Sequence, residues 1–158
     1  MRVAIVTVSD TVAAGTREDA SGPAALAYCR GLGWEIITSL VFSDDPAQLR
    51  EQLRKLADSG RVDLILTSGG TGLGPRDNTP ESTVAIADMR IPGIAEEMRR
   101  IGAQSTPTAL LSRAVAVVRN KTIIVNLPGS PKGAVESLAA IAHLLPHAIH
   151  VIHGGRHD

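Results

Sequence analysis

The sequence has few aromatic residues and no excess charge of either sign. Only 2% of its 158 residues are aromatic, and Tyr28, Trp34 and Phe42 all lie in the first third of the chain. Three such rings cannot form a base-stacking platform for single-stranded nucleic acid. The 16 Lys and Arg residues balance the 16 Asp and Glu residues, so there is no basic excess to release counterions from nucleic acid. The composition therefore excludes nucleic acid as a partner.

The sequence also has only one cysteine and no long apolar run. Cys29 cannot form an internal disulfide, and its place in a predicted helix indicates a small buried apolar residue. No apolar stretch approaches the roughly 20 residues that a membrane span needs. The short apolar stretch of residues 3–8 lacks the pattern of a signal peptide. We therefore expect a soluble cytoplasmic protein without a membrane partner.

What the sequence does have is enough apolar content for a folded core. Hydrophobic residues make up 44% of the chain, and nearly all of them are aliphatic. No internal repeat, low-complexity tract or linker interrupts the pattern. A chain of this length is typical of one compact domain, so we predict a single domain over residues 1–158.

Strand-length apolar runs alternate with helix-length segments. The first runs are nearly unbroken, which is typical of parallel strands buried on both faces. The predicted strands are residues 3–8, 34–42, 62–67, 114–118 and 122–126, the last two joined by a turn at Asn120-Lys121. The predicted helices start near residues 21, 45, 79, 93 and 134; Ser21 and Thr79 are expected to be N-caps, and the helix after Thr79 is expected to run to about residue 88. This order predicts an α/β fold of three layers, with a mostly parallel sheet between helices.

Three predicted strands end in residues that can carry chemistry. Ser9-Asp10 follows the first strand, Asp44-Asp45 the second, and a glycine-rich loop leading to Asp77 the third. In parallel sheets, ligands bind outside the carboxyl ends of the strands. We therefore expect these carboxylates to converge at one edge of the sheet.

The glycine-rich loop, residues 69–74, can bring bare backbone N–H groups to an anion. It matches neither the Walker A pattern nor the dinucleotide pattern GxGxxG. Taken alone, it could equally be a tight structural turn. Asp44 and Asp77 beside such a loop have the chemistry of a Mg²⁺–nucleotide site, because Mg²⁺ binds one or two carboxylates and bridges phosphate oxygens. Asp45, next to Pro46, is the better N-cap.

A second loop, Pro128-Gly129-Ser130-Pro131-Lys132-Gly133, lies between a predicted strand and a helix N-terminus and is a second candidate anion cradle. Arg113 at the start of the fourth strand could bind a phosphate, or it could be an ordinary surface arginine. The histidines lie near the end of the chain, where no cysteine or carboxylate completes a zinc site, so we expect a surface or subunit contact. They are His143, His147, His150, His153 and His157.

Together these motifs resemble the molybdopterin-binding family of the bacterial MogA and MoaB proteins and the gephyrin-type G domains. The similarity spans nearly the whole chain, and it depends on many short motifs that occur in the same order. The most informative are Thr67-Ser68-Gly69-Gly70-Thr71-Gly72, Pro75-Arg76-Asp77-Asn78-Thr79-Pro80-Glu81, Leu111-Ser112-Arg113 and Asn126-Leu127-Pro128-Gly129-Ser130-Pro131.

The resemblance implies an enzyme of molybdenum cofactor biosynthesis that uses Mg²⁺ to transfer AMP from ATP to molybdopterin and releases pyrophosphate. By position, Asp44 and Asp77 match the two acidic residues associated with Mg²⁺ and adenylyl transfer in the family. The resemblance assigns the other matched positions to the binding of pterin phosphate and nucleotide: Ser9, Asp10, Ser68, Gly69, Gly70, Thr71, Gly72, Thr79, Glu81, Ser112, Arg113, Asn126, Pro128, Gly129 and Ser130.

Other readings of the same resemblance stay open. One is a non-catalytic molybdopterin-binding module of the MoaB kind, and another is a nucleotide pyrophosphatase related to competence-damage proteins. The resemblance also implies a homo-oligomer, either a trimer or a hexamer of paired trimers, and either molybdenum or tungsten as the metal inserted later. The sequence departs from the family pattern at Asn78, Val117 and Asn120. Asn tolerates a positive φ, so Asn120 can still turn the chain.

Overall fold

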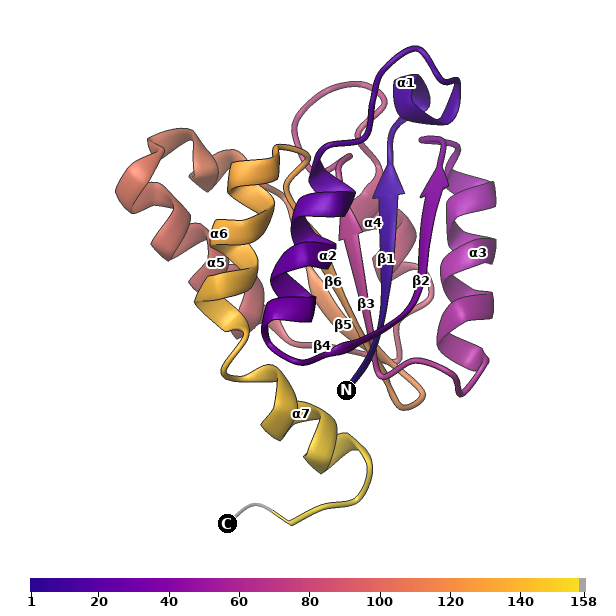
Figure 1. Cartoon of the computed structure of the whole chain (residues 1–158), viewed down its shortest axis with the longest axis vertical. Helices are drawn as coiled ribbons and strands as arrows, with labels where there is room; N and C mark the ends of the chain where they lie inside the picture. Colours follow the sequence, from indigo (N-terminus) through magenta and orange to yellow (C-terminus); the bar gives the residue numbers. More distant parts are fainter. Residues whose placement is uncertain (157–158) are drawn as a thin grey trace.

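In the computed structural model, which describes residues 1–156, six strands form one sheet in the order β2-β1-β3-β6-β5-β4 (Figure 1). The four parallel strands are β1 (Arg2–Val8), β2 (Glu35–Phe42), β3 (Leu64–Ser68) and β6 (Thr122–Leu127). β5 (Ala116–Arg119) runs antiparallel to β6, and the two-residue β4 (Met89–Arg90) pairs antiparallel with β5. The predicted mostly parallel sheet is confirmed, and β4 is an edge strand that the sequence did not indicate.

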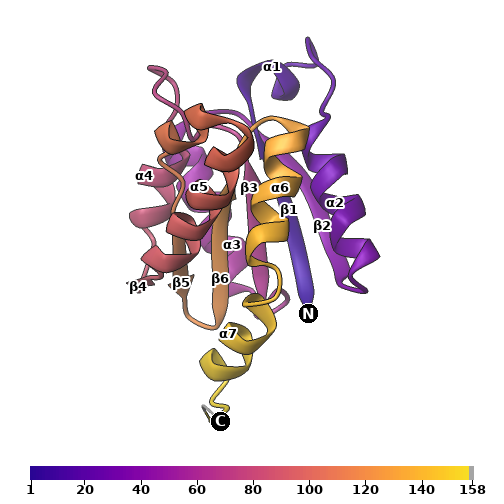
Figure 2. The same ribbon diagram turned by 90° about the vertical axis from the view of Figure 1, so that its left-hand side faces the viewer.

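Helices cover both faces of the sheet, which confirms the predicted three layers (Figures 1 and 2). One face carries α2 (Ser21–Gly31), α5 (Pro92–Ser105), α6 (Pro131–Ile141) and α7 (Leu145–Ile152), and the other face carries α3 (Pro46–Asp58) and α4 (Thr79–Val84). Two short elements, α1 (Asp10–Ala13) and the 3-10 helix η1 (Pro107–Leu111), lie in connections.

Alternate side chains of each central strand enter two separate apolar cores. In β1, Val3 and Ile5 pack on the face with α2 and α6, whereas Ala4 and Val6 pack on the face with α3. All four are fully buried. A strand buried on both sides has no polar face, which is why the sequence shows unbroken apolar runs.

Local signals predicted some helix ends and missed others. Asp45 caps α3 as predicted, because its Oδ1 accepts a hydrogen bond of 2.8 Å from the backbone N–H of Gln48. The expectation that Ser21 caps α2 is wrong: Asp19 accepts from the N–H of Gly22 at 3.0 Å. Asn78, not Thr79, precedes α4, and this helix ends at Val84 before the predicted residue 88.

The two positions in the β-hairpin that depart from the family pattern fit the sheet. Asn120 has a φ of +51°, so it forms the predicted turn between β5 and β6. Val117 is fully buried and pairs with Ile124 in a regular antiparallel ladder. The departures at these two positions therefore leave the geometry of the sheet intact.

The buried cysteine and the C-terminal helices also match the sequence analysis. Cys29 is fully buried in α2, and desolvation raises the pKa of its thiol to about 11, so it is a packing residue. Between residues 1 and 156, no single helix is long and apolar enough to cross a membrane. The bent pair α6 and α7 reaches the necessary length and composition, but α6 buries its apolar face against the sheet.

A partly buried ion pair joins the first strand to the start of the third. Asp63 accepts hydrogen bonds from the backbone N–H of Arg2 at 2.8 Å and from its guanidinium at 2.7 Å. Burial alone would raise the pKa of Asp63, but the hydrogen bonds and charge of Arg2 outweigh it and the net pKa is lowered. His153 of the C-terminal segment lies 3.8 Å from the same carboxylate.

We predict that Asp63→Asn lowers the free energy of unfolding at pH 7 by about 1–3 kcal/mol, because a charge-assisted pair is lost. The folded-state pKa of Asp63 lies below the value of about 3.9 that this carboxyl has in the unfolded chain. The ion pair therefore stabilises the protein fully above about pH 3.9, and this stabilisation is lost as the pH falls through the folded-state pKa. The difference between wild type and variant in urea unfolding should therefore shrink below about pH 4. The control Glu51→Gln removes an exposed pair with Arg54 and should cost much less, because solvent screens that pair. Equal losses in both variants would contradict the prediction.

Candidate active site

A cavity of about 320 Å³ lies at the carboxyl edge of the sheet, where the strand order reverses between β1 and β3. Such switch points are where parallel sheets bind ligands. The ends of all four parallel strands contribute to the cavity. Its lining includes Val8 and Ser9 after β1, Asp44 after β2, Ser68, Gly69 and Gly70 after β3, Gly129 and Ser130 after β6, and Asp77.

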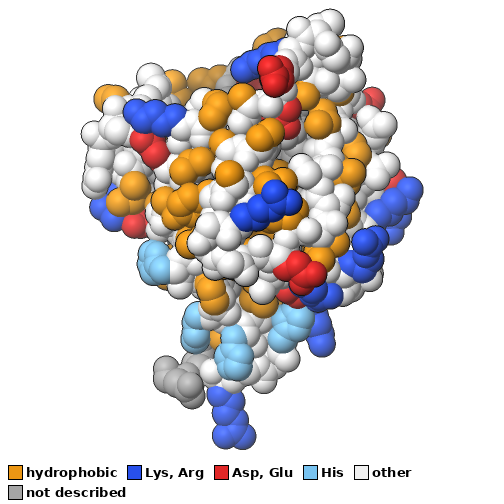
Figure 3. Space-filling model, in the orientation of Figure 1, with side chains coloured by type: hydrophobic (Ala, Val, Ile, Leu, Met, Phe, Trp, Pro, Cys, Tyr) orange, Lys and Arg blue, Asp and Glu red, His pale blue; other side chains and the backbone are white. Residues whose placement is uncertain are grey.

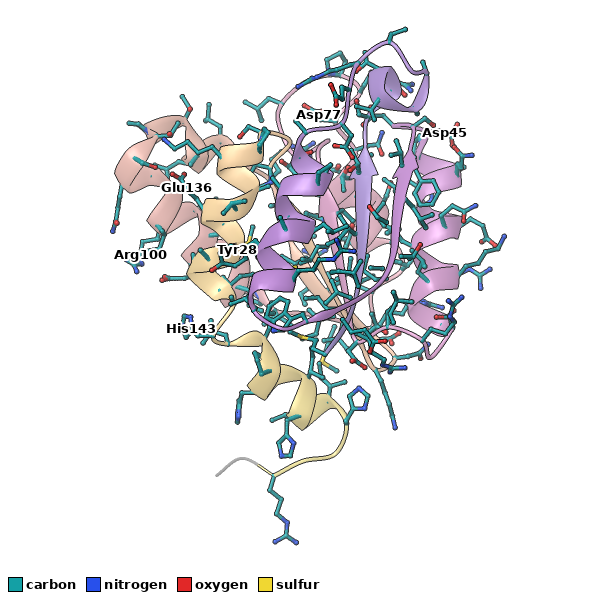
Figure 4. All side chains as sticks on the ribbon, in the orientation of Figure 1. Tyr28, Asp45, Asp77, Arg100, Glu136 and His143 are labelled. Carbon is teal, nitrogen blue, oxygen red and sulfur yellow. The ribbon has the colours of Figure 1, made fainter. Side chains whose placement is uncertain are left out.

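Asp44 is a half-buried carboxylate in the wall of this cavity. Its Oδ2 accepts from the N–H of Asp10 at 2.9 Å, and the Oδ1 of Asp10 accepts from the N–H of Asp44 at 2.9 Å. Burial raises the pKa of Asp44, and the negative charges of Asp10 and Asp77 raise it further. The predicted convergence of the three carboxylates is therefore confirmed. Figure 4 shows the labelled Asp45 and Asp77 at this same end of the sheet.

The carboxylate of Asp10 forms an ion pair with Arg76. The guanidinium of Arg76 donates to both oxygens of Asp10, at 2.9 and 3.0 Å, and lowers the pKa of that exposed carboxyl. Asp10 does not line this cavity. Its part in the site is to hold Asp44 through their reciprocal hydrogen bonds, while Asp44 and Asp77 face the cavity.

The glycine loop has backbone conformations and contacts that leave no space for side chains. Gly69 and Gly70 have φ values of +105° and +67°. A Cβ at Gly69 would collide with the carbonyl oxygen of Val8, and one at Gly70 would collide with Oγ1 of Thr79 and lie 3.2 Å from Oδ1 of Asp44. The loop therefore lies directly against the carboxyl end of β1 and against the Asp44 carboxylate.

Arg113 holds the glycine loop from behind. Its Nε donates to the carbonyl of Gly72 at 2.8 Å, its Nη2 to the carbonyl of Asp77 at 2.7 Å, and its backbone N–H to the carbonyl of Thr71 at 2.9 Å. Its remaining contact is an ion pair with Glu81. Arg113 and Glu81 thus fix the loop that carries Asp77, and neither lines a cavity.

Two asparagines connect the parts of the site. Asn126 is fully buried. Its amide donates to the hydroxyls of Thr67 at 3.0 Å and Thr83 at 2.9 Å, so both of these hydrogen bonds are made within the protein. Asn78, a departure from the family pattern, donates to the carbonyl of Asp44 at 2.7 Å and to that of Arg76 at 3.0 Å. Asn78 therefore joins the Asp77 loop to the Asp44 loop.

A second cavity, of about 300 Å³, adjoins the first, and Ser130 lines both. It opens between α5, η1 and the start of α6, and part of its wall is apolar: Ala95, Met98, Ala109, Leu111 and Ala114. The predicted residues that line it are Thr71, Gly72, Ser112, Pro128 and Ser130. Charged side chains of Arg99, Lys132 and Glu136 complete the wall, and Figure 4 labels Glu136 on α6.

Most of the predicted site residues line the two cavities. The cavities bring together Ser9, Asp44, Ser68, Gly69, Gly70, Thr71, Gly72, Asp77, Ser112, Pro128, Gly129 and Ser130. The structure places Asp10, Thr79, Glu81, Arg113 and Asn126 behind or beside these walls, and their part in ligand binding stays a prediction.

One wall of each cavity consists of residues that the sequence pattern did not indicate. In the first cavity this is the segment before α2, where Asp19 accepts from the hydroxyl of Thr7 at 2.6 Å beside Arg17 and Ser21. The spacing from Asp19 to Gly22, typical of an N-cap, could have shown it. In the second cavity it is the α5 side, with Met98 and Arg99. An amphipathic helix pattern does not show that a gap lies beside the helix.

No histidine lies in either cavity. Figure 3 shows the histidine side chains around the α7 end of the molecule, and Figure 4 labels His143 there. His157 lies outside the described residues. In the described chain, no group of three or more His, Cys, Asp or Glu side chains is placed to hold a metal ion.

The fold and the site define a class: an α/β protein with a ligand site at the carboxyl edge of its sheet and two adjoining cavities. Residues 4–147 match the family described as "Probable molybdopterin binding domain". The chain belongs to this family.

Known proteins of similar sequence and structure support this assignment. A curated relative named molybdopterin adenylyltransferase, from Escherichia coli strain K12, is 39% identical over 89% of this chain and 73% of its own length. A solved structure of the molybdopterin biosynthesis enzyme MoaB from Thermus thermophilus has a TM-score of 0.91 and 47% identity, covering 99% of both chains. The molybdopterin biosynthesis Mog protein from Mycobacterium ulcerans has a TM-score of 0.87 and 41% identity, covering 95% of this chain and 97% of its own.

We predict that Gly70→Ala destabilises the protein more than Gly33→Ala. Both glycines have a positive φ, but a Cβ at Gly33 meets nothing within 4 Å. Gly33→Ala should therefore cost only the left-handed backbone, about 1–2 kcal/mol. Gly70→Ala should cost a further 1–3 kcal/mol, roughly, because its methyl group collides with Thr79. Urea unfolding measures both, and equal losses would contradict the close packing of the loop.

Proposed function

We propose that the protein is a molybdopterin adenylyltransferase that acts in molybdenum cofactor biosynthesis. The observation that carries the proposal is the pair of adjoining cavities, one of which places Asp44 and Asp77 beside a glycine loop. A phosphate oxygen of molybdopterin would attack the α-phosphorus of ATP, and the bond from the α-phosphorus to the bridging oxygen would break. Adenylyl-molybdopterin and pyrophosphate would be the products.

The chain contributes alignment and electrostatics to such a reaction. Phosphoryl and nucleotidyl transfer need little covalent help, and correct positioning with stabilised charge supplies most of the rate. The N–H of Gly69 is already bonded to the carbonyl of Leu127 at 3.1 Å, so of these two glycines it is Gly70 whose N–H, with no side chain to shield it, could bind an anion. Ser130, which lines both cavities, lies where two bound ligands would meet.

The residues of the first cavity fit a magnesium ion. Mg²⁺ prefers carboxylate oxygens and keeps several waters, and Asp44 and Asp77 are two carboxylates without a guanidinium or ammonium partner in the described chain. When bound, the ion would neutralise charge on the phosphates of ATP. Asp44 and Asp77 would hold it and would orient the nucleotide.

The second cavity fits a flat ring that is not held by stacking. No aromatic residue of the described chain lines either cavity. Tyr28, Trp34 and Phe42 instead pack beside the two apolar cores. We infer that aliphatic side chains of α5 and η1 contact the faces of the ring, while hydroxyl and backbone groups bind its polar edge.

We predict that Asp77→Asn and Asp44→Asn each lower turnover at least about 100-fold, because each removes a charge that orients the reacting phosphates. Molybdopterin binding should survive in Asp77→Asn. Asp45→Asn is the matched control: this neighbour caps α3, so the change should leave turnover within about twofold and cost at most about 1 kcal/mol of stability. The assay is mass analysis of the product after incubation with ATP, Mg²⁺ and molybdopterin.

The same assay tests the alternatives. Unchanged turnover in Asp77→Asn would contradict the role of this residue. Wild-type protein that binds molybdopterin but forms no product would be the non-catalytic module. Hydrolysis of ADP-ribose in place of adenylyl transfer would identify a nucleotide pyrophosphatase.

We expect the enzyme to work in the cytoplasm as a homotrimer, which the family resemblance implies. Large apolar side chains on the surface, among them Leu73, Met89 and Leu110, are each at least 60% exposed in the single chain and are available for subunit contacts. Light scattering coupled to size exclusion should give three times the 16.5 kDa chain mass. A mass of one chain at micromolar concentration would contradict the trimer, and six chains would indicate paired trimers.

A further inference from the structure

The hydroxyl of Thr79 is buried without a hydrogen-bond partner. Thr79 is fully buried, and in the described chain its Oγ1 is the buried side-chain oxygen or nitrogen atom that lacks a partner. The nearby hydroxyls are satisfied: Thr83 donates to the carbonyl of Thr79 at 2.8 Å and accepts from Asn126. An unmet buried hydroxyl costs about 1–3 kcal/mol, so its presence needs an explanation.

This hydroxyl lies directly against Gly70. A Cβ on Gly70 would collide with Oγ1 of Thr79 and would lie 3.2 Å from Oδ1 of Asp44. The backbone N–H of Thr79 donates to the carbonyl of Gly70 at 3.1 Å and holds the two residues together. The orphaned hydroxyl and one carboxylate oxygen of Asp44 therefore lie on the same side of Gly70, which is possible because this residue has no side chain.

The Asp44 carboxylate lacks a donor on that side. Its Oδ2 accepts from the N–H of Asp10, whereas no described donor reaches its Oδ1. A donor without an acceptor thus faces an acceptor without a donor.

We infer that Thr79 is a positioning residue for Asp44, whose Oδ1 accepts a hydrogen bond from the Thr79 hydroxyl when a magnesium–nucleotide complex occupies the first cavity. The bond forms beside the Cα of Gly70 and fixes the orientation of the carboxylate. In the free protein it is open, and the cost of the unmet hydroxyl is recovered on binding. The inference takes the nucleotide from the proposed function, but its main test requires no turnover.

The test compares Thr79→Val, which keeps the shape and removes the hydroxyl, with Thr79→Ser, which keeps the hydroxyl. In the free protein, Thr79→Val should raise the Tm by about 2–4 °C, because an unmet polar group is removed. The Kd for ATP with Mg²⁺, measured by calorimetry without molybdopterin, should rise about tenfold, because binding no longer gains the hydrogen bond. Thr79→Ser should keep the nucleotide affinity of the wild type.

Two controls separate this role from a structural one. Thr83→Val removes a neighbouring hydroxyl that is already bonded, so its Tm should fall where that of Thr79→Val rises. In a double-mutant cycle with Asp44→Asn, the effect of Thr79→Val on the nucleotide Kd should largely disappear, because the two side chains act as a pair.

A lower Tm in Thr79→Val, or an unchanged nucleotide Kd, would overturn the inference. The proposed function fails differently: wild-type protein that binds the nucleotide but forms no adenylyl-molybdopterin would overturn it and leave the comparison of Thr79 variants intact. Wild-type protein that does not bind ATP with Mg²⁺ would overturn both.

Discussion

The site depends on the close contact of three strand ends through glycine backbone. The N–H of Gly69 donates to the carbonyl of Leu127 at 3.1 Å, which joins the end of β3 to the end of β6. On its other side Gly69 meets the carbonyl of Val8, and a Cβ on Gly129 would lie 3.3 Å from its Cα. A side chain at either glycine would separate these strand ends. The cavity exists in its observed shape because the backbones can approach this closely.

Arg113 and Arg76 hold this arrangement by binding groups other than the carboxylates of Asp44 and Asp77. Arg113 donates hydrogen bonds to carbonyls of the glycine loop and of Asp77, and it pairs with Glu81. Arg76 pairs with Asp10. Asp44 and Asp77 are therefore fixed through their backbones and neighbours, and their charge is not cancelled. This division keeps negative charge available for a cation while the surrounding protein stays close to neutral.

The sequence predicted the features that depend on local pattern, and missed those that depend on contacts across the chain. Apolar runs predicted the parallel strands, and the residue types after them predicted the carboxyl edge and the capping role of Asp45. The role of Arg113 could not be predicted, because its partners lie far away in the sequence and a guanidinium serves a carbonyl as well as a phosphate. The burial of Asn126 between Thr67 and Thr83 likewise follows only from the packing of α4 on β6.

Two unfavourable features lie close to Gly70 of the glycine loop. Asp44 is a desolvated carboxylate near two other acids, and Thr79 carries an unmet hydroxyl, so both destabilise the free protein. Directly behind them, Asn126 forms a satisfied network with Thr67 and Thr83 that keeps β3, β6 and α4 together. A ligand that relieves the cavity side gains affinity without reorganising the core. The stability that the fold gives up at this edge therefore becomes binding energy at the place where the reaction is proposed to occur.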